Sequence, residues 1–501
     1  MNPRRIFLFC LFPLLVFRIW LAMALPITGD EAYFIWWGRI PDWGYYDHPP
    51  MIGWWLAVQL LLGDGIGWLR LTSVLQPFVL AAAVAVMLPR IRTEENATGN
   101  DRRWWAALFT LLAPVAVWNV LITTDTPLIY FSVFSGLAWL RARRDDDLRW
   151  YLLAGIFLAG AVLSKYFVAF LGFAYLVDAL WRPHRKKIVG LALCYACTLP
   201  TLALMAWWNA GHCWPNFMFN FVNRHEDAGL SWKTPLLYAS MMLYVLTPPL
   251  AWRLLRAREV AATHFSLALL AFVPLILFAI LSLVKTIGLH WVLSFVPFAA
   301  MLVALTQEPA TLRNTGRFVA GFALLHVIVV LVISRLPLES WRNFDFYRST
   351  VLAFESAQIQ QRLASYGDAY VLASDGYADA ATLGANSRHY VVVFGAASSH
   401  ARHDDILTDF RLLDHRNILV VSKNQPRLDD YAPYFDAVNV EPLTLRGATF
   451  YIVVGRNFDY PHYRDTVLAD IRRKYYSIPA WLPQTACYFC QRYFQETVCR
   501  R

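Results

Sequence analysis

Two acidic side chains follow directly on a long apolar run near the start of the chain. Asp30 and Glu31 come after the run Ile6–Leu25. A carboxylate at this place could accept a proton from an incoming hydroxyl and orient it for attack. The alternative is a structural role, because acids also favour the first turn of a helix. Carboxylates are costly beside hydrocarbon, so the pair is a candidate catalytic site if the run spans a membrane.

A second motif, Asp47-His48, precedes Pro49-Pro50. The prolines hold the backbone extended and stiffen the pair before them. Asp and His are both ligand types for a divalent metal ion. A rigid turn capped by Asp47 is the alternative interpretation.

Asp125 and Lys165 each interrupt an apolar stretch. Asp125 precedes Pro127 at the start of a predicted helix, so it is either a helix cap or a second functional acid. Lys165 is either a side chain that extends to the membrane interface or a cation for a phosphate group. Lys285 and His290 flank another turn, and the same two readings apply to them.

A polar loop near the middle of the chain contains Arg224, His225, Glu226 and Asp227. Its cations and carboxylates could contact a phosphate and a metal together, or they could form an exposed set of salt bridges. The sequence contains no Gly-x-Gly-x-x-Gly and no P-loop, so a nucleotide bound through these motifs is unsupported.

Composition indicates what surrounds these residues. Of 501 residues, 58% are apolar and 16% charged, and the mean hydropathy is +0.40. These values are typical of a polytopic α-helical membrane protein rather than a soluble one. The net charge of +10 does not indicate nucleic-acid binding, because the basic residues lie in short clusters between apolar runs.

About eleven membrane-spanning helices are predicted, the first of them a retained helix rather than a cleaved signal peptide. They are expected at residues 5–25, 68–89, 104–119, 126–141, 150–164, 166–181, 187–208, 234–252, 263–284, 289–306 and 317–335. The shorter apolar patch Met51–Leu62 is expected to lie along the membrane surface.

The loops between these spans alternate in charge. Clusters such as Arg141-Ala142-Arg143-Arg144 and Arg185-Lys186-Lys187 alternate with loops that carry isolated cations. By the positive-inside rule the clustered loops are cytoplasmic. The candidate residues therefore gather on one external face, which comprises Asp30, Asp47, Asp125, Lys165, Arg224, His225, Lys285 and His290.

Residues 336–501 are more polar and are predicted to form an external α/β domain, following a transmembrane domain at 1–335. Strands are expected at Ala369–Ser374, Tyr390–Phe394, Asn417–Ser422 and Thr449–Gly455, and helices near Thr350–Tyr366, His403–Leu413 and Tyr463–Tyr475. Cys487-x-x-Cys490 in this region could pair or bind a metal.

Taken together, the motifs Asp-Glu-Ala-Tyr, Gly-Tyr-Tyr-Asp-His-Pro-Pro, Thr-Asp-Thr-Pro and Leu-Ser-Lys resemble bacterial membrane glycosyltransferases of the GT-C fold. The family named by this resemblance is ArnT-like and related to protein O-mannosyltransferases. It implies a polyprenyl-phosphate sugar donor, a reaction on the periplasmic face of the inner membrane, and inversion at the sugar. The expected acceptor is lipid A, lipopolysaccharide or another lipid-linked glycan.

The resemblance also implies roles for individual residues. Asp30, with Glu31 beside it, and Asp125 match functional acidic positions, and Lys165 matches a contact to the donor phosphate. Asp47 and His225 match positions that hold a divalent metal ion in the aminoarabinose enzyme of this family.

Two positions depart from that enzyme. Tyr33 and His48 stand where it has an Arg and a Lys that contact phosphate. The phosphate site is therefore expected to use other groups, drawn from Arg224, Lys285, His290 and His48 itself.

Two other functions compete with this reading. The acceptor could instead be Ser or Thr of a protein. A transporter or flippase is the alternative of another class, but transporters often show internal repeats and mid-membrane charges, and neither pattern is found here.

Overall fold

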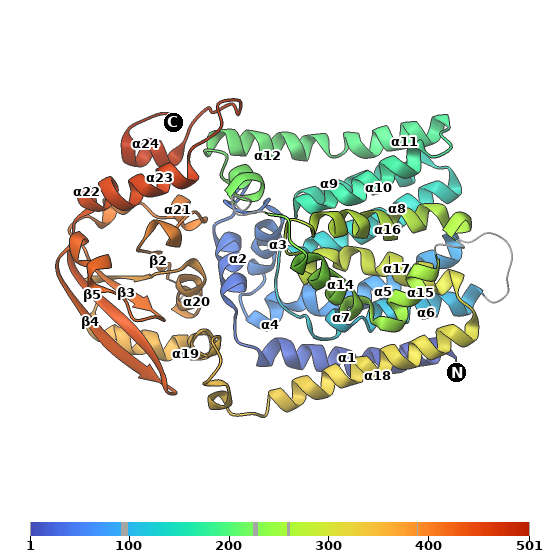
Figure 1. The fold of residues 1–501 in the computed structure, drawn as a ribbon, viewed down its shortest axis with the longest axis horizontal. Helices are drawn as coiled ribbons and strands as arrows, with labels where there is room; N and C mark the ends of the chain where they lie inside the picture. The colour runs from blue at the N-terminus through green and yellow to red at the C-terminus, as the bar shows by residue number, and fades with distance from the viewer. Residues whose placement is uncertain (1, 92–98, 224–228, 258–260, 388, 500–501) are drawn as a thin grey trace. The chain divides into compact units, whose positions relative to one another are not determined.

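The computed structural model describes residues 2–91, 99–223, 229–257, 261–387 and 389–499 (Figure 1). Its internal contacts divide the chain into two compact units. Unit 1 comprises Met1–Ala24, Gly63–Ala203 and Asp227–Arg335. Unit 2 comprises Leu25–Leu62, Leu204–Glu226 and Leu336–Arg501. Two earlier segments thus group with residues 336–501, and the expected division into domains at residue 335 stays a prediction.

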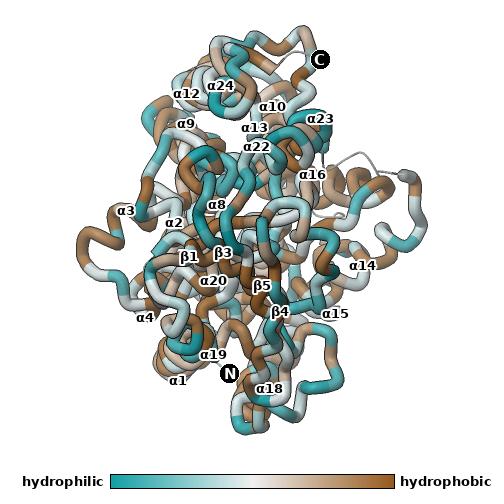
Figure 2. The backbone as a smooth tube through the Cα atoms, turned by 90° about the vertical axis from the view of Figure 1, so that its left-hand side faces the viewer, coloured by the Kyte–Doolittle hydropathy of each residue, from teal (hydrophilic) through white to brown (hydrophobic). Residues whose placement is uncertain are grey.

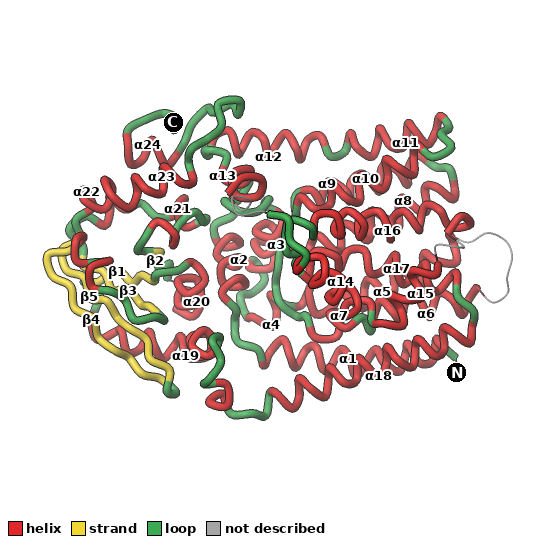
Figure 3. The backbone as a smooth tube through the Cα atoms, in the orientation of Figure 1, coloured by secondary structure: helices red, strands yellow, loops and turns green. Residues whose placement is uncertain are grey.

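The described part of unit 1 contains helices and no strands (Figure 3). Its α-helices are α1 (Pro3–Ala24), α4 (Ile66–Leu69), α5 (Leu71–Ile91), α6 (Gly99–Leu111), α7 (Pro114–Trp118), α8 (Asp125–Asp145), α9 (Leu148–Val162), α10 (Ala169–Leu180), α11 (Arg185–Ala196), α12 (Leu199–Gly211, which continues into unit 2), α14 (Lys233–Leu246), α15 (Pro248–Ala257), α16 (Phe265–Leu281), α17 (Val296–Thr306) and α18 (Pro309–Ile333).

Five helical stretches among the described residues are long and apolar enough to cross a membrane. They are Pro3–Ala24, Ile66–Leu88, Arg185–Gly211, Leu289–Thr306 and Pro309–Ile333. Shorter apolar helices include Leu148–Val162, Tyr166–Leu180 and Phe265–Leu281. The eleven predicted spans all coincide with helical stretches, while the number that crosses the bilayer stays a prediction.

One cation inside the first helix shows how unit 1 satisfies buried polar groups. Arg18 of α1 is completely buried. Its guanidinium donates to the backbone carbonyls of Ser73 at 2.6 Å, Val74 at 3.0 Å and Asn119 at 2.8 Å. These bonds tie α1 to α5 and to the segment that leads toward α8, since a buried donor without an acceptor would be costly.

Unit 2 is built around a five-stranded sheet of order β2-β1-β3-β5-β4. The strands are β1 (Tyr370–Ser374), β2 (Val392–Val393), β3 (Asn417–Ser422), β4 (Phe435–Leu445) and β5 (Ala448–Phe458). The first three are mutually parallel, and β5 pairs antiparallel with both β3 and β4. Four of these coincide with predicted strands, whereas β4 was not predicted.

The sequence of β4 explains why it escaped prediction. It is an edge strand that contains Pro442, and most of its side chains are at least partly exposed. Proline and polar residues are tolerated at an edge, but they weaken the sequence signal for a strand. Both β4 and β5 contain hydrophobic and hydrophilic residues, as the hydropathy colouring of Figure 2 shows.

Each face of the sheet is covered by its own apolar cluster. Helices α19 (Tyr347–Leu363) and α20 (Tyr377–Ser387) cover one face, where Leu419 and Val454 point. The other face, with Val420 and Val453, packs against α22 (Tyr460–Tyr463), α23 (Ala469–Tyr475) and α24 (Tyr488–Phe494). The alternation of neighbouring residues between the clusters is the period of two expected for a strand.

The helices predicted in this region are only partly as expected. The one near Thr350–Tyr366 is confirmed as α19. The stretch His403–Leu413 is broken into the short helix α21 (Asp404–Leu407) and a 3-10 turn, and Tyr463–Tyr475 contains a π-helical segment before α23.

Two helices from the early part of the chain also belong to unit 2. They are α2 (Gly29–Arg39) and α3 (Met51–Leu60), which contact each other. The start of α2 lies directly on α20, because a Cβ atom at Gly29 would be 2.7 Å from the Cβ of Ala378. Only glycine permits this approach, and it brings the acidic motif of α2 beside the C-terminal region.

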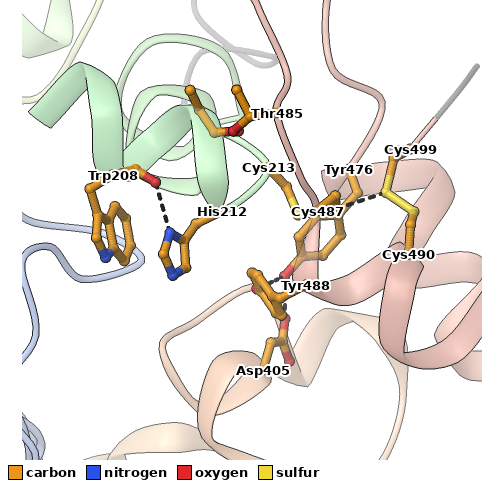
Figure 4. Close-up of a disulfide and its surroundings, with 11 residues drawn as sticks. Trp208, His212, Cys213, Asp405, Tyr476, Thr485, Cys487, Tyr488, Cys490 and Cys499 are labelled. Carbon is orange, nitrogen blue, oxygen red and sulfur yellow. Dashed lines mark hydrogen bonds between the residues drawn. A yellow bond between two sulfur atoms is a disulfide. The ribbon is translucent and has the colours of Figure 1, made fainter. Parts of the chain in front are cut away.

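Two disulfides close unit 2 (Figure 4). Cys213 pairs with Cys487, and Cys490 pairs with Cys499. The two cysteines of the Cys-x-x-Cys motif therefore do not pair with each other. Each finds a partner that only the folded chain brings near.

Candidate functional site

In unit 1 the structure brings together three of the predicted residues, here called the Asp125 cluster: Asp125, Lys165 and His290. The Nζ atom of Lys165 lies 3.1 and 2.9 Å from the two carboxylate oxygens of Asp125. Nε2 of His290 lies 3.7 Å from Oδ2 of the same carboxylate. The three residues come from three different stretches of the chain.

Local structure explains their placement. Asp125 is the first residue of α8, where a negative charge favours the positive end of the helix dipole. Lys165 occupies an extended position between α9 and the 3-10 helix Tyr166–Val168. His290 lies in the 3-10 helix Leu289–Phe295, next to Trp291, whose ring centre is 5.9 Å from Nζ of Lys165.

The burial of this cluster suggests a role beyond stability. The side chains of Asp125 and Lys165 are 3% and 9% exposed, whereas that of His290 is 48% exposed. Taking an ion pair out of water costs about as much as the attraction returns, so a buried pair is weak evidence for stabilisation. An ionisable pair kept among apolar helices is a functional candidate, and a half-exposed imidazole gives it access from outside.

In unit 2 the structure shows a second group, here called the Asp30–Asp47 cluster: Asp30, Tyr33, Asp47, Tyr377 and Arg402. The Asp30 side chain is exposed and accepts a hydrogen bond of 3.2 Å from the hydroxyl of Tyr377. Asp47 is 4% exposed, and its Oδ2 lies 3.3 Å from the Arg402 guanidinium. Its Oδ1 lies 3.5 Å from the hydroxyl of Tyr33.

Arg402 connects the two acids. Its guanidinium carbon lies 4.6 Å from the ring centre of Tyr377 and 4.7 Å from that of Phe219. Burial, the largest single influence, would lower the pKa of Arg402, but the charge of Asp47 and the nearby Tyr33, Tyr377 and Tyr46 together raise it. Arg402 therefore stays charged beside Asp47 while packing on the ring that binds Asp30.

The tyrosines of this cluster are held as neutral donors. Burial first, and then the charge of Asp30, raises the pKa of Tyr377 to about 12. Burial and the charge of Asp47 raise the pKa of Tyr33 well above its usual value. Both hydroxyls therefore keep their protons at neutral pH.

Sequence reasoning missed Tyr377 and Arg402. Both lie in the region that was predicted only to form a separate α/β domain, and neither belongs to a recognisable motif. The close approach at Gly29 places Tyr377 beside Asp30, and no local pattern could have shown it.

The remaining predicted residues have other surroundings. Glu31 is completely buried and completes a capping box with Thr28 at the start of α2, which supports the structural alternative considered for it. His48 is half-buried against Phe34 and Trp37, with ring centres 6.3 and 6.2 Å apart. Lys285 is half-buried four residues after the end of α16.

The predicted metal site includes a residue outside the described ranges. Arg224 and His225 lie outside the described residues. Within the described ranges, no cluster of three or more possible ligands includes Asp47, and Arg402 already lies against one of its oxygens. The metal site of Asp47 and His225 stays a prediction.

The convergence of Asp30 with Asp125 and Lys165 also stays a prediction. Asp30 belongs to unit 2, and the other two belong to unit 1. Each unit thus brings together a carboxylate, a cation and a hydrogen-bond donor. Such groups can carry out acid–base chemistry on a phosphate-bearing substrate.

Comparison with known proteins identifies relatives of this chain. Residues 47–208 match the family described as dolichyl-phosphate-mannose-protein mannosyltransferase. A lipid A galacturonosyltransferase, RgtD of Rhizobium johnstonii, is 30% identical over 209 residues, covering 39% of this chain and 42% of that protein. The chain thus matches less than half the length of this curated relative.

One solved structure matches the fold over most of the chain. The crystal structure of ArnT from Cupriavidus metallidurans bound to undecaprenyl phosphate superposes with a TM-score of 0.62 at 14% identity. The match covers 88% of this chain and 96% of ArnT. The resemblance to ArnT-like membrane proteins of the GT-C fold, indicated by the sequence motifs, is confirmed.

Proposed function

We propose that this chain, a relative of the ArnT-like GT-C glycosyltransferases, transfers a sugar from a polyprenyl-phosphate donor to a lipid-linked acceptor. The acceptor is lipid A, lipopolysaccharide or a similar glycan. The protein would be a multi-pass inner-membrane enzyme whose site faces the periplasm. The single observation that carries the proposal is the Asp125 cluster, a buried carboxylate–ammonium pair reached by a half-exposed imidazole.

The Asp125 cluster suits the donor phosphate. The ammonium of Lys165 and a protonated His290 would donate to the phosphate oxygens, which gain negative charge as the bond from phosphate oxygen to sugar carbon breaks. Asp125 would hold Lys165 in place. The polyprenyl chain would remain in the bilayer, with its phosphate at headgroup level.

The Asp30–Asp47 cluster suits the acceptor. Asp30 would take the proton from the acceptor hydroxyl while its oxygen attacks the sugar carbon from the face opposite the leaving phosphate. A bond forms between acceptor oxygen and sugar carbon, the bond to the phosphate breaks, and the configuration inverts. Tyr377 would orient Asp30, and Arg402 would hold Asp47.

Two observations bear on the substrates. The name of RgtD makes galacturonic acid the first sugar to test. The family matched by residues 47–208 is described by a protein acceptor, which favours protein O-glycosylation as the second candidate.

The test is reconstitution of the purified chain in proteoliposomes with undecaprenyl-phosphate sugars. Lipid A and a Ser/Thr-rich peptide would be offered as separate acceptors, and products would be identified by mass spectrometry. We expect a mass increase of one sugar on lipid A that requires the donor lipid. Modification of the peptide alone would replace the proposal by its second candidate, and no transfer with any donor would refute both.

A further inference from the structure

A cavity in unit 2 lies outside both clusters described above. Its volume is about 710 Å³, and three stretches of the chain line it: 342–349, 423–424 and 447–451. The first includes the start of α19, the second follows β3, and the third includes the turn between β4 and β5. Three cations line the cavity, Arg342, Arg348 and Lys423, with one carboxylate, Asp345.

Arg342 is seated against a glycine. A Cβ atom at Gly447 would lie 2.7 Å from the guanidinium carbon of Arg342. Gly447 has a φ of +72° in the turn between β4 and β5, a conformation that favours glycine. The backbone of the turn thus provides a flat surface on which the guanidinium rests, and this limits the directions in which it can donate.

Arg348 is held by neutral partners. It donates to the backbone oxygen of Lys423 at 2.8 Å and to Oδ1 of Asn424 at 3.1 Å. Lys423, in contrast, pairs with Asp379 at 3.0 Å. In the described parts of the chain, neither Arg342 nor Arg348 forms an ion pair with a carboxylate. The cavity therefore presents two guanidinium groups that are not within ion-pair distance of a carboxylate, although Glu339 interacts electrostatically with Arg342 and Asp345 lines the same cavity.

The other lining groups suit a sugar. Asn343, Asn424, Thr449 and Tyr451 bring amides and hydroxyls to the same cavity, and such groups both donate to and accept from sugar hydroxyls. A guanidinium is a planar fork of donors that matches a phosphate or carboxylate. The volume lies within the range of about 300–1,000 Å³ typical of small-molecule sites.

Exposed aromatic residues border the cations. Phe344 lines the cavity, and Phe344 and Phe346 are 52% and 49% exposed. The segment that contains them begins at Leu338, a few residues after the membrane-length helix α18. Aromatic side chains and cations together are typical of a surface that meets lipid headgroups.

We propose that this cavity binds the phosphate-bearing sugar of an anionic glycolipid, with Arg342 and Arg348 on the phosphate. That this sugar belongs to the acceptor lipid rests on the proposed function. The binding of a phosphate-bearing sugar in the cavity does not. The site would hold the acceptor lipid by a group that does not react.

The experiment measures binding to the full chain in detergent by isothermal titration calorimetry. The probe is N-acetylglucosamine 1-phosphate, with N-acetylglucosamine and inorganic phosphate titrated separately. We expect saturable binding of the sugar phosphate, tighter than that of inorganic phosphate and absent for the neutral sugar. R342Q and R348Q should each weaken it about tenfold or more, because each removes a charged hydrogen-bond donor.

The matched control is R362Q. It removes an exposed arginine of α19, the helix that contains Arg348, at the opposite end of that helix. It should bind as the wild type does, and R348K, which keeps the charge but loses the fork, should be intermediate. Equal affinity for inorganic phosphate, or binding unchanged in both R342Q and R348Q, would overturn the inference. If the chain binds the sugar phosphate but transfers no sugar, only the proposed function is refuted. If it transfers sugar but does not bind the sugar phosphate, only the proposal for the cavity is refuted.

Discussion

The hydroxyl of Tyr377 donates a hydrogen bond to Asp30 across 347 positions of sequence. The bond links the acidic motif after the first apolar run to the helix that covers the C-terminal sheet. The C-terminal region therefore contributes a hydrogen bond to the candidate catalytic base, Asp30.

Replacing Tyr377 by Phe tests this link. We expect kcat/KM for sugar transfer to fall by about tenfold, because one hydrogen bond to a charged group is lost while the ring that packs on Arg402 remains. Y370F is the matched control, since the hydroxyl of Tyr370 has no hydrogen-bond partner among the described residues. An additional loss when Y377F is combined with Asp30→Asn would show that Tyr377 acts by another route.

The pair Asp47–Arg402 is expected to stabilise unit 2. Arg402→Gln leaves the buried carboxylate of Asp47 without its cation, and we expect this to cost about 1–3 kcal/mol in the free energy of unfolding. The double variant with Asp47→Asn should recover part of the loss. Thermal denaturation of the detergent-solubilised protein measures it, and fully additive losses would mean that the two residues are not coupled.

Lys165 and Asp125 allow structure and catalysis to be separated. Lys165→Met and Asp125→Asn should each lower both stability and activity, because each leaves one buried charge alone. The double variant should regain stability but show at most about 1% of wild-type transfer, if the cation acts on the donor phosphate. Restored activity in the double variant would assign the pair a purely structural role.

Asp404 makes stability depend on pH. Burial, and the nearby charge of Asp405, raise the pKa of Asp404 to about 7, although Tyr390 donates to its Oδ1 at 3.0 Å. The folded protein therefore binds a proton that the unfolded chain releases near pH 4. The stabilising effect of the neutral acid is full below that pH and is lost as the pH rises toward 7, at about 1.4 kcal/mol per unit.

A nearby group acts in the opposite sense. Burial, with His212 adding to it, lowers the pKa of His403 to about 3, so its contribution to stability is lost as the pH falls below about 6.5. The comparison of Asp404→Asn with the wild type isolates the acid. The variant's relative stability should increase from pH 4 to 7, and a constant difference would contradict the assignment.

The disulfides are expected to matter for stability. Cys213→Ser opens the loop closed by Cys213 and Cys487, which are 274 residues apart, and should cost several kcal/mol on the chain-entropy account. Cys10→Ser, at a free cysteine, is the control. Mass spectrometry of non-reduced peptides should find the pairs 213–487 and 490–499, and a 487–490 peptide would contradict them.

The sequence indicated which single residues could take part in chemistry. It did not indicate as well which residues lie together in the folded chain. Asp125 and Lys165 were each recognisable because they interrupt apolar runs, but their pairing depends on how α8 and α9 rotate and pack, which hydrophobic periodicity does not determine. Tyr377 and Arg402 carry no local signal, because only the folded chain brings them beside Asp30 and Asp47. The strands β1, β2, β3 and β5 were readable from short β-rich runs, whereas β4 has Asp, Asn and Glu between its apolar residues and contains a proline.

The bond between Cys213 and Cys487 also constrains the order of events during biosynthesis. A thiol at position 213 leaves the ribosome long before its partner exists, so this bond cannot form until residue 487 has been made. Formation of this disulfide thus requires an oxidant that is available after residue 487 has been synthesised.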